Sequence, residues 1–94
     1  MKKNTLLSFA MLLCAVMHGQ KNAAEISKNV KQANLLMLEQ NYTNALKYLL
    51  ISYHLDSLNA NINYKIGYCY LLSSFAKTKA EHYLLEATKN ISKN

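Results

Sequence analysis

From Ala23 onward the chain contains no proline and a single glycine, Gly67. Proline and glycine are the residues that most often interrupt helices, so their scarcity leaves long uninterrupted segments. In these segments apolar residues recur at spacings of three and four rather than two, which is the period of an amphipathic α-helix. We therefore predict an all-α fold, and 94 residues leave room for at most one small domain.

Polar breaks divide this region into four predicted helices of similar length. The breaks are Glu39 to Asn41, Asp56 to Asn59, and the polar stretch that begins at Ser73. Asn and Ser side chains cap helices, so Ser57 or Asn59 is expected to cap the third one. The predicted helices span residues 24–39, 42–55, 60–73 and 77–91. Because the loops are short, consecutive helices are expected to form two antiparallel hairpins.

Each predicted helix carries one apolar face at helical spacing, and the four faces together would form the core. The residues expected on these faces are Ile26, Val30, Ala33 and Met37; Ala45, Tyr48, Leu49, Ser52 and Leu55; Asn63, Ile66, Gly67, Tyr70 and Leu71; and Ala80, Tyr83, Leu84, Ala87 and Ile91. In the last helix Leu85 falls outside the apolar stripe, and Asn90 is expected on a solvent-facing side.

A repeat of about 34 residues relates the two halves of this region. The pattern Ala45-x-x-Tyr48-Leu49 returns as Ala80-x-x-Tyr83-Leu84, at an offset of 35 residues. The helices that precede these patterns align less closely, at an offset of 34. An extra residue in the last loop accounts for the difference because loops absorb insertions. The repeating unit is therefore one helix hairpin.

The combination Ile66-Gly67-x-x-Tyr70, with small residues at Ala80 and Ala87, resembles the tetratricopeptide repeat. The resemblance covers residues 24–91, with a degenerate repeat at about 24–57 and a better match at about 58–91. In the first repeat Ala33 and Leu36 replace the glycine and tyrosine of the family. The resemblance implies that Gly67 lets the two helices of its hairpin approach closely. It assigns repeat packing to Ala45, Leu49, Ile66, Gly67, Tyr70, Ala80, Tyr83, Leu84 and Ala87.

The second half of the chain carries a closer resemblance. The run from Asn59 to Leu71, followed by a loop with lysines and by Ala80-x-x-Tyr83-Leu84, is similar to the helical repeats that open certain exported Bacteroidetes proteins. In those proteins a propeller and an OmpA-like peptidoglycan-binding domain follow the repeats. The resemblance implies a truncated or stand-alone amino-terminal module, and the activities of the downstream domains do not carry over.

Stacked hairpins of this kind leave the first helix of each hairpin on a concave surface, where partners generally bind. The residues expected on this surface are Asn34, Asn61, Tyr64, Tyr68 and Leu72. Tyr64 and Tyr68 lie one helical turn apart, and tyrosine offers a large contact area with a polar tip. The alternative is that these tyrosines only fill gaps between helices. The family's carboxylate clamp is matched only by Asn34, so recognition of chain ends is not predicted.

Residues 1–19 have the pattern of a secretory signal peptide. Lys2 and Lys3 provide a cationic start, and the apolar run from Thr5 to Met17 is too short to span a bilayer. Cleavage after Gly19 is predicted, with a lipid anchor at Cys14 and an uncleaved anchor as alternatives. Cleavage or lipidation would place the protein outside the cytoplasm, in the periplasm or at the inner face of the outer membrane.

The sequence lacks the spacings typical of catalytic or metal sites. Its five acidic residues include no pair three or four positions apart, and no HxxxH, HExxH or CxxC motif occurs. No glycine-rich phosphate loop or nucleophile elbow is present. Signal cleavage would leave Cys69 as the last cysteine, and its apolar run predicts a buried thiol rather than redox chemistry. We expect no enzyme activity, no cofactor and no metal.

The formal net charge of +6 comes from lysine alone among the basic residues. These lysines are scattered, whereas a nucleic-acid site needs a clustered stripe, so no nucleic-acid partner is predicted. The same scatter disfavours a small basic membrane-active peptide, which needs lysines gathered on one face. Contact with membranes is expected only indirectly, through envelope complexes.

The sequence favours an exported, non-catalytic repeat module that mediates protein interaction or scaffolding by binding a protein or peptide. The alternative is a truncated remnant or a self-associating structural subunit of a longer envelope protein. This alternative is open because two repeats fall short of the three that such folds usually need for stability.

Overall fold

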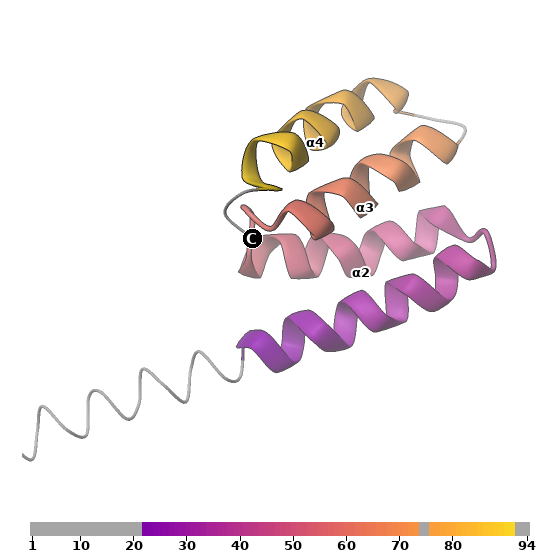
Figure 1. Ribbon diagram of the computed structural model, residues 1–94. Coiled ribbons are helices and arrows are strands. Elements are labelled where there is room, and N and C mark those ends of the chain that lie inside the picture. Colours follow the sequence, from indigo (N-terminus) through magenta and orange to yellow (C-terminus); the bar gives the residue numbers. More distant parts are fainter. Residues whose placement is uncertain (1–21, 74–75, 92–94) are drawn as a thin grey trace, which may run out of the picture.

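The computed structural model describes residues 22–73 and 76–91, which are helical apart from their connecting loops. Residues 22–38 form one helical segment, followed by α2 (Tyr42–Leu55), α3 (Ala60–Leu72) and α4 (Lys77–Asn90). The segments lie side by side in chain order, and each runs antiparallel to the one before it (Figure 1). The described residues contain no strand, so the predicted all-α fold of two antiparallel hairpins is confirmed.

The predicted signal peptide, residues 1–19, lies outside the described residues. Among residues 22–73 and 76–91, no helix combines the length and the apolar character that crossing a bilayer requires. The proposed export of the chain therefore rests on its sequence alone.

Asparagine side chains cap the N-termini of two helices, α2 and α3. The Oδ1 atom of Asn59 accepts a hydrogen bond from the backbone N–H of Ile62 at 3.1 Å, and Asn41 accepts one from Asn44 at 3.4 Å. Each bond satisfies one of the N–H groups that a helix start leaves without an intrahelical partner. Asn59, rather than Ser57, is therefore the cap of α3. At α4 the capping position holds Ala76, which provides no side-chain hydrogen bond.

A tight C-terminal turn separates the 22–38 segment from α2. The backbone N–H of Asn41 donates to the carbonyl of Leu36 at 2.8 Å, and that of Gln40 donates to Met37 at 3.0 Å. These two bonds form a Schellman motif, which places one residue in the left-handed region. That residue is Gln40, with φ of 60°. The turn forms here without the glycine that usually occupies this position.

The core lies between the helices and contains most of the residues assigned to repeat packing. Ala45, Leu49, Ile66, Gly67, Tyr70, Ala80 and Ala87 are buried, and Tyr83 and Leu84 are partly buried. Ala33, Leu46, Ile62 and Cys69 are also buried in this core. All four helical segments therefore contribute both small and large apolar side chains, or one of the two kinds, to the same core.

The tightest contact in the core lies between Gly67 of α3 and α4. A Cβ atom at Gly67 would lie 2.7 Å from Cγ of Leu84 and 3.2 Å from the carbonyl oxygen of Ala80. Both distances are shorter than ordinary van der Waals contact, so any side chain at residue 67 would require Leu84 to move and α4 to shift slightly. Next to this contact the rings of Tyr70 and Tyr83 stack with centroids 5.7 Å apart.

Buried polar side chains connect the helices to their neighbours. Ser52 of α2 is fully buried, and its hydroxyl donates to the backbone carbonyl of Ile26 at 3.1 Å. Asn63 of α3 is also fully buried, and its Nδ2 atom donates to the carbonyls of Ser57 and Asn59, both at 2.9 Å. Because buried polar groups are costly without partners, these bonds fix the side chains to one arrangement. Within the described part of the chain, the Oδ1 atom of Asn63 has no hydrogen-bond partner.

Four burial predictions were wrong, and all four concern helix ends. Leu55, Leu71 and Ile91 were expected in the core but are exposed. Each lies in the last turn of its helix or at its C-cap, where the helical period continues but the neighbouring helix no longer covers the side chain. Asn90 was expected on a solvent-facing side but is buried, with its Nδ2 atom donating to the carbonyl of Glu86 at 2.8 Å.

Replacing Gly67 with alanine tests the close approach of α3 and α4. Alanine raises intrinsic helix stability by about 1 kcal/mol over glycine, whereas overpacking typically costs about 1–3 kcal/mol. We expect Gly67→Ala to destabilise the protein by up to about 2 kcal/mol, measured by urea unfolding followed by circular dichroism. In a Leu84→Ala background, the same substitution should be neutral or stabilising because the colliding side chain is absent. A stabilising effect of Gly67→Ala with Leu84 present would contradict the contact.

Candidate functional site

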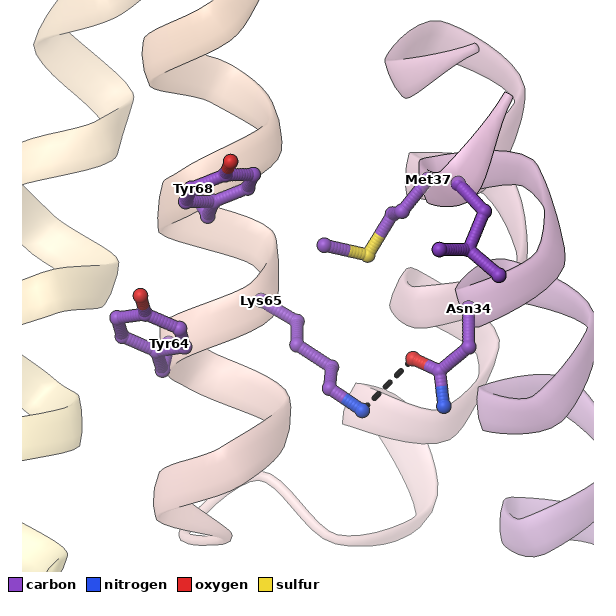
Figure 2. Close-up of a pocket in the computed structure, with 6 residues that line it drawn as sticks. Asn34, Met37, Tyr64, Lys65 and Tyr68 are labelled. Carbon is purple, nitrogen blue, oxygen red and sulfur yellow. Dashed lines mark hydrogen bonds between the residues drawn. The ribbon is translucent and has the colours of Figure 1, made fainter. Parts of the chain in front are cut away.

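An open groove lies between the 22–38 helix and α3. Its lining residues are Asn34, Met37 and Leu38 on one side and Tyr64, Lys65 and Tyr68 on the other. The groove has a volume of about 550 Å³, which is in the size range of small-ligand and side-chain pockets. Figure 2 shows the two walls: Lys65 extends from α3 toward Asn34 and Met37 on the opposite helix, whereas the ring of Tyr64 lies on the side of α3 away from that helix. The groove is thus formed by the first helices of the two hairpins.

Two tyrosines form the aromatic part of the groove. The ring centroids of Tyr64 and Tyr68 are 6.1 Å apart, and the rings are tilted by 32°. Tyr68 is 37% exposed and is supported by the ring of Tyr42 in the first turn of α2, in an edge-to-face contact at 6.1 Å. Tyr64 is 52% exposed. The groove therefore presents a large aromatic surface to solvent, and Tyr42 holds one half of that surface in place.

Lys65 crosses the gap between the two helices. Its Nζ atom donates a hydrogen bond of 2.7 Å to Oδ1 of Asn34 (Figure 2). Burial lowers the pKa of the Lys65 ammonium, because partial loss of water disfavours the charged form. Among residues 22–73 and 76–91, the single salt bridge joins Lys89 to Glu86, so no described carboxylate pairs with Lys65.

The structure brings together three of the five residues expected on the concave surface. Asn34, Tyr64 and Tyr68 line the groove. Asn61 lies instead in a second hollow, which it shares with Tyr64 and with residues of α4. Leu72, in the last turn of α3, is exposed but does not line the groove.

Three groove residues were not among the predicted partner-binding residues. Met37 was assigned to the core, and it both packs against the core and lines the groove. Leu38 is 82% exposed at the end of its helix. Lys65 was treated as one of many scattered lysines. Its position beside Tyr64 and one turn before Tyr68 is the one sequence signal that places Lys65 near the predicted partner-binding surface. Its contact with Asn34 depends on how the two hairpins stack.

The described residues offer no arrangement for metal binding, because no three His, Cys, Asp or Glu side chains among them gather closely enough to hold an ion. Cys69 is fully buried in α3, and burial raises the pKa of its thiol to about 11. A thiol with this pKa stays protonated at neutral pH and is a poor nucleophile. The ring of His82 contacts Tyr83, and that of His54 contacts Tyr53.

Comparisons with known proteins add no assignment for the groove. No family model, no curated protein and no solved structure matches the chain. The functional interpretation of the groove therefore depends on its residues and their geometry.

Proposed function

We propose that this chain is an exported, non-catalytic helical-repeat module of the tetratricopeptide type, which binds a protein or peptide segment. The observation that carries the proposal is the open groove between the 22–38 helix and α3, with Tyr64 and Tyr68 on one wall. Exposed aromatic side chains in a groove are the usual anchors of protein interfaces. The position of the groove, between the first helices of two stacked hairpins, is the position at which helical-repeat proteins hold their partners.

The chemistry of the groove supports a peptide better than a small metabolite. The walls are largely apolar, the groove is open to solvent, and its polar side-chain groups are limited to Asn34, Lys65 and the tyrosine hydroxyls. Small-molecule sites usually enclose most of their ligand and add several convergent polar groups. A peptide that lies across an open groove needs only pockets for a few of its side chains.

Export is the part of the proposal that a purified protein can test directly. Expressed in a bacterium with two membranes, the protein should accumulate in the periplasm with Gln20 as its first residue, because the signal peptide is cleaved after Gly19. Intact-mass measurement of the periplasmic fraction checks this. Leu12→Arg interrupts the apolar run and should keep the precursor in the cytoplasm. A lipid-modified product beginning at Cys14, or an uncleaved chain with wild-type Leu12, would contradict cleavage.

The binding role is tested by removing both tyrosines of the groove. Short random peptides displayed on phage are selected on the wild-type protein, and the affinity of the selected peptides is then measured by fluorescence polarisation. Tyr64→Ala combined with Tyr68→Ala should weaken binding at least about tenfold, or about 1.4 kcal/mol, because two aromatic anchors are lost. The far-ultraviolet circular dichroism should stay unchanged since both side chains are exposed.

The matched control for this experiment is a double variant outside the groove. Ile51 and Leu58 are exposed apolar residues on α2 and in the loop that follows it. Their replacement by alanine should leave peptide affinity unchanged. Peptides that bind the tyrosine variant as tightly as the wild type would remove the groove as the binding site.

A second candidate function is self-association, which a shallow hollow on α4 favours. Leu71 and Leu85 are both about half exposed and lie in one hollow with Leu84, between α3 and α4. Exposed apolar side chains gathered in one hollow are suited to contact with a second copy. Lys77, Glu81 and Thr88 also line this hollow, whose surface is nevertheless mostly apolar.

Light scattering during gel filtration tests this second candidate. If the hollow on α4 is an interface, the wild type should be larger than a monomer at micromolar concentration, and Leu85→Lys should return it to a monomer because a charge then enters the contact. Leu58→Lys, in the loop between α2 and α3 and outside this hollow, is the control and should change nothing. A wild type that is monomeric and melts cooperatively would refute self-association.

A further inference from the structure

The hollow on α4 corresponds to the surface of the first hairpin that α3 covers. With the offset of 35 residues, Lys77 in the hollow is equivalent to Tyr42 of α2, and Glu81 is equivalent to Leu46. Leu46 is buried, and the ring of Tyr42 contacts that of Tyr68 on α3. In a helical repeat each unit contacts the next in the same way, so a helix equivalent to α3 fits the hollow on α4.

A second copy of the chain offers such a helix. The 22–38 helix is the equivalent of α3, at an offset of 34 residues. On α3, Lys65 bonds to Asn34 of the first hairpin, and Cys69, one turn further along the same face, is fully buried. The equivalents of these two residues are Lys31 and Leu35, which are both exposed. The 22–38 helix thus presents a cation and an apolar side chain on its outer side.

The contact within one copy indicates which residues meet in the same packing between two copies. α2 and α3 run antiparallel, and Tyr42 in the first turn of α2 contacts Tyr68 of α3 (Figure 1). Leu46 lies one helical turn after Tyr42, and Lys65 lies about one turn before Tyr68. Leu46 and Lys65 are therefore at the same level of the contact between α2 and α3.

The equivalents of Leu46 and Lys65 carry opposite charges. They are Glu81 on α4 and Lys31 on the 22–38 helix, and both side chains are exposed. The one salt bridge within residues 22–73 and 76–91 lies elsewhere on α4, so neither charge is paired within one copy. Packing in the same register places them at the same level of a contact between copies, where the flexible stem of lysine lets its ammonium reach the carboxylate.

We propose that copies of this chain stack head to tail, with the 22–38 helix of one copy in the hollow on α4 of the next, Lys31 paired with Glu81 and Leu35 on the apolar lining of the hollow. This inference rests on self-association, the second candidate function, and names the surface of the second copy that fits the hollow. Because Glu81 replaces the equivalent of a buried leucine, the contact between copies depends more on charge than the contact within a copy.

The two contact surfaces lie on opposite sides of the molecule. The 22–38 helix and α4 are the outermost of the four helical segments, one at each end of the row (Figure 1). Each copy therefore offers one helix and one hollow, and the pairing of two copies leaves a helix and a hollow unused. Such a contact continues as an open row, whereas a symmetric contact between two α4 hollows ends at a dimer.

Charge reversal on either side of the contact tests the proposal. Sedimentation velocity at low salt gives the average mass of the purified wild type, Lys31→Glu, Glu81→Lys and Lys47→Glu from low to high micromolar concentration. Lys47 is an exposed lysine of α2 that lines neither hollow of α4, so Lys47→Glu is the matched control for a change of net charge. All variants should keep the wild-type circular dichroism because the substituted side chains are exposed.

The average mass of the wild type should rise steadily with concentration without levelling at the dimer, and added salt should lower it because ions screen the pairing. Lys31→Glu and Glu81→Lys should each weaken association about tenfold, since attraction becomes repulsion. Lys47→Glu should associate like the wild type. An equimolar mixture of Lys31→Glu and Glu81→Lys should associate again, because the exchanged charges attract each other.

Three results would overturn the proposal. A wild type that is monomeric at every concentration removes self-association altogether. A wild type that levels at the dimer, and that Glu81→Lys weakens but Lys31→Glu does not, assigns the contact to two α4 hollows, so self-association stands with a different surface. A mixture that associates no better than its two components shows that Lys31 and Glu81 do not pair. The tyrosine groove is tested separately, and the peptide-binding function stands or falls by that test.

Discussion

The arrangement of the molecule depends on the contact between Gly67 and α4. At this point the two helices are so close that a Cβ atom on Gly67 would collide with Leu84 and crowd the carbonyl of Ala80. The side chain of Leu84 occupies the space that a side chain at residue 67 would need, and Tyr70 and Tyr83 stack on each other between the same two helices. The face of α3 that contains Gly67 is thereby committed to α4, and the face that contains Lys65 lies toward the 22–38 helix. The groove follows from this division of α3 into two faces.

Buried polar side chains help to fix the arrangement within the first hairpin and at the loop that joins the two hairpins. Asn63 joins the loop after α2 to the start of α3, and Ser52 joins α2 to the 22–38 helix. These bonds are directional, unlike the apolar contacts around them, so they favour one register where hydrophobic packing alone tolerates several. The distance between Asn34 and Lys65, on the first helices of the two hairpins, depends on that register. The buried polar groups therefore contribute to the shape of the groove without lining it.

The sequence was informative wherever a local signal was present. The spacing of apolar residues and the asparagine caps predicted the helix ends to within about one or two residues. Both signals depend only on residues that are neighbours in the sequence. Leu71 and Ile91 were misplaced since periodicity does not say where a neighbouring helix stops covering its partner. The left-handed turn at Gln40 carries no glycine and could not be recognised. Lys65 was missed because its contact with Asn34 spans two hairpins and has no signature in either segment alone.

The repeat itself indicates which surface is suited to a partner. With the offset of 35 residues, Tyr42, Leu46 and Tyr53 of α2 correspond to Lys77, Glu81 and Thr88 of α4. On α2 these positions face the second hairpin, where Leu46 is buried and the two tyrosines contact the rings of Tyr68 and Tyr83. On α4 the same positions are polar and exposed. Polar residues on an outer face reduce the stability gained by stacking another hairpin there. The positions that are apolar between the two hairpins are therefore polar on the outer face of α4. Exposed aromatic side chains lie instead in the groove between the 22–38 helix and α3.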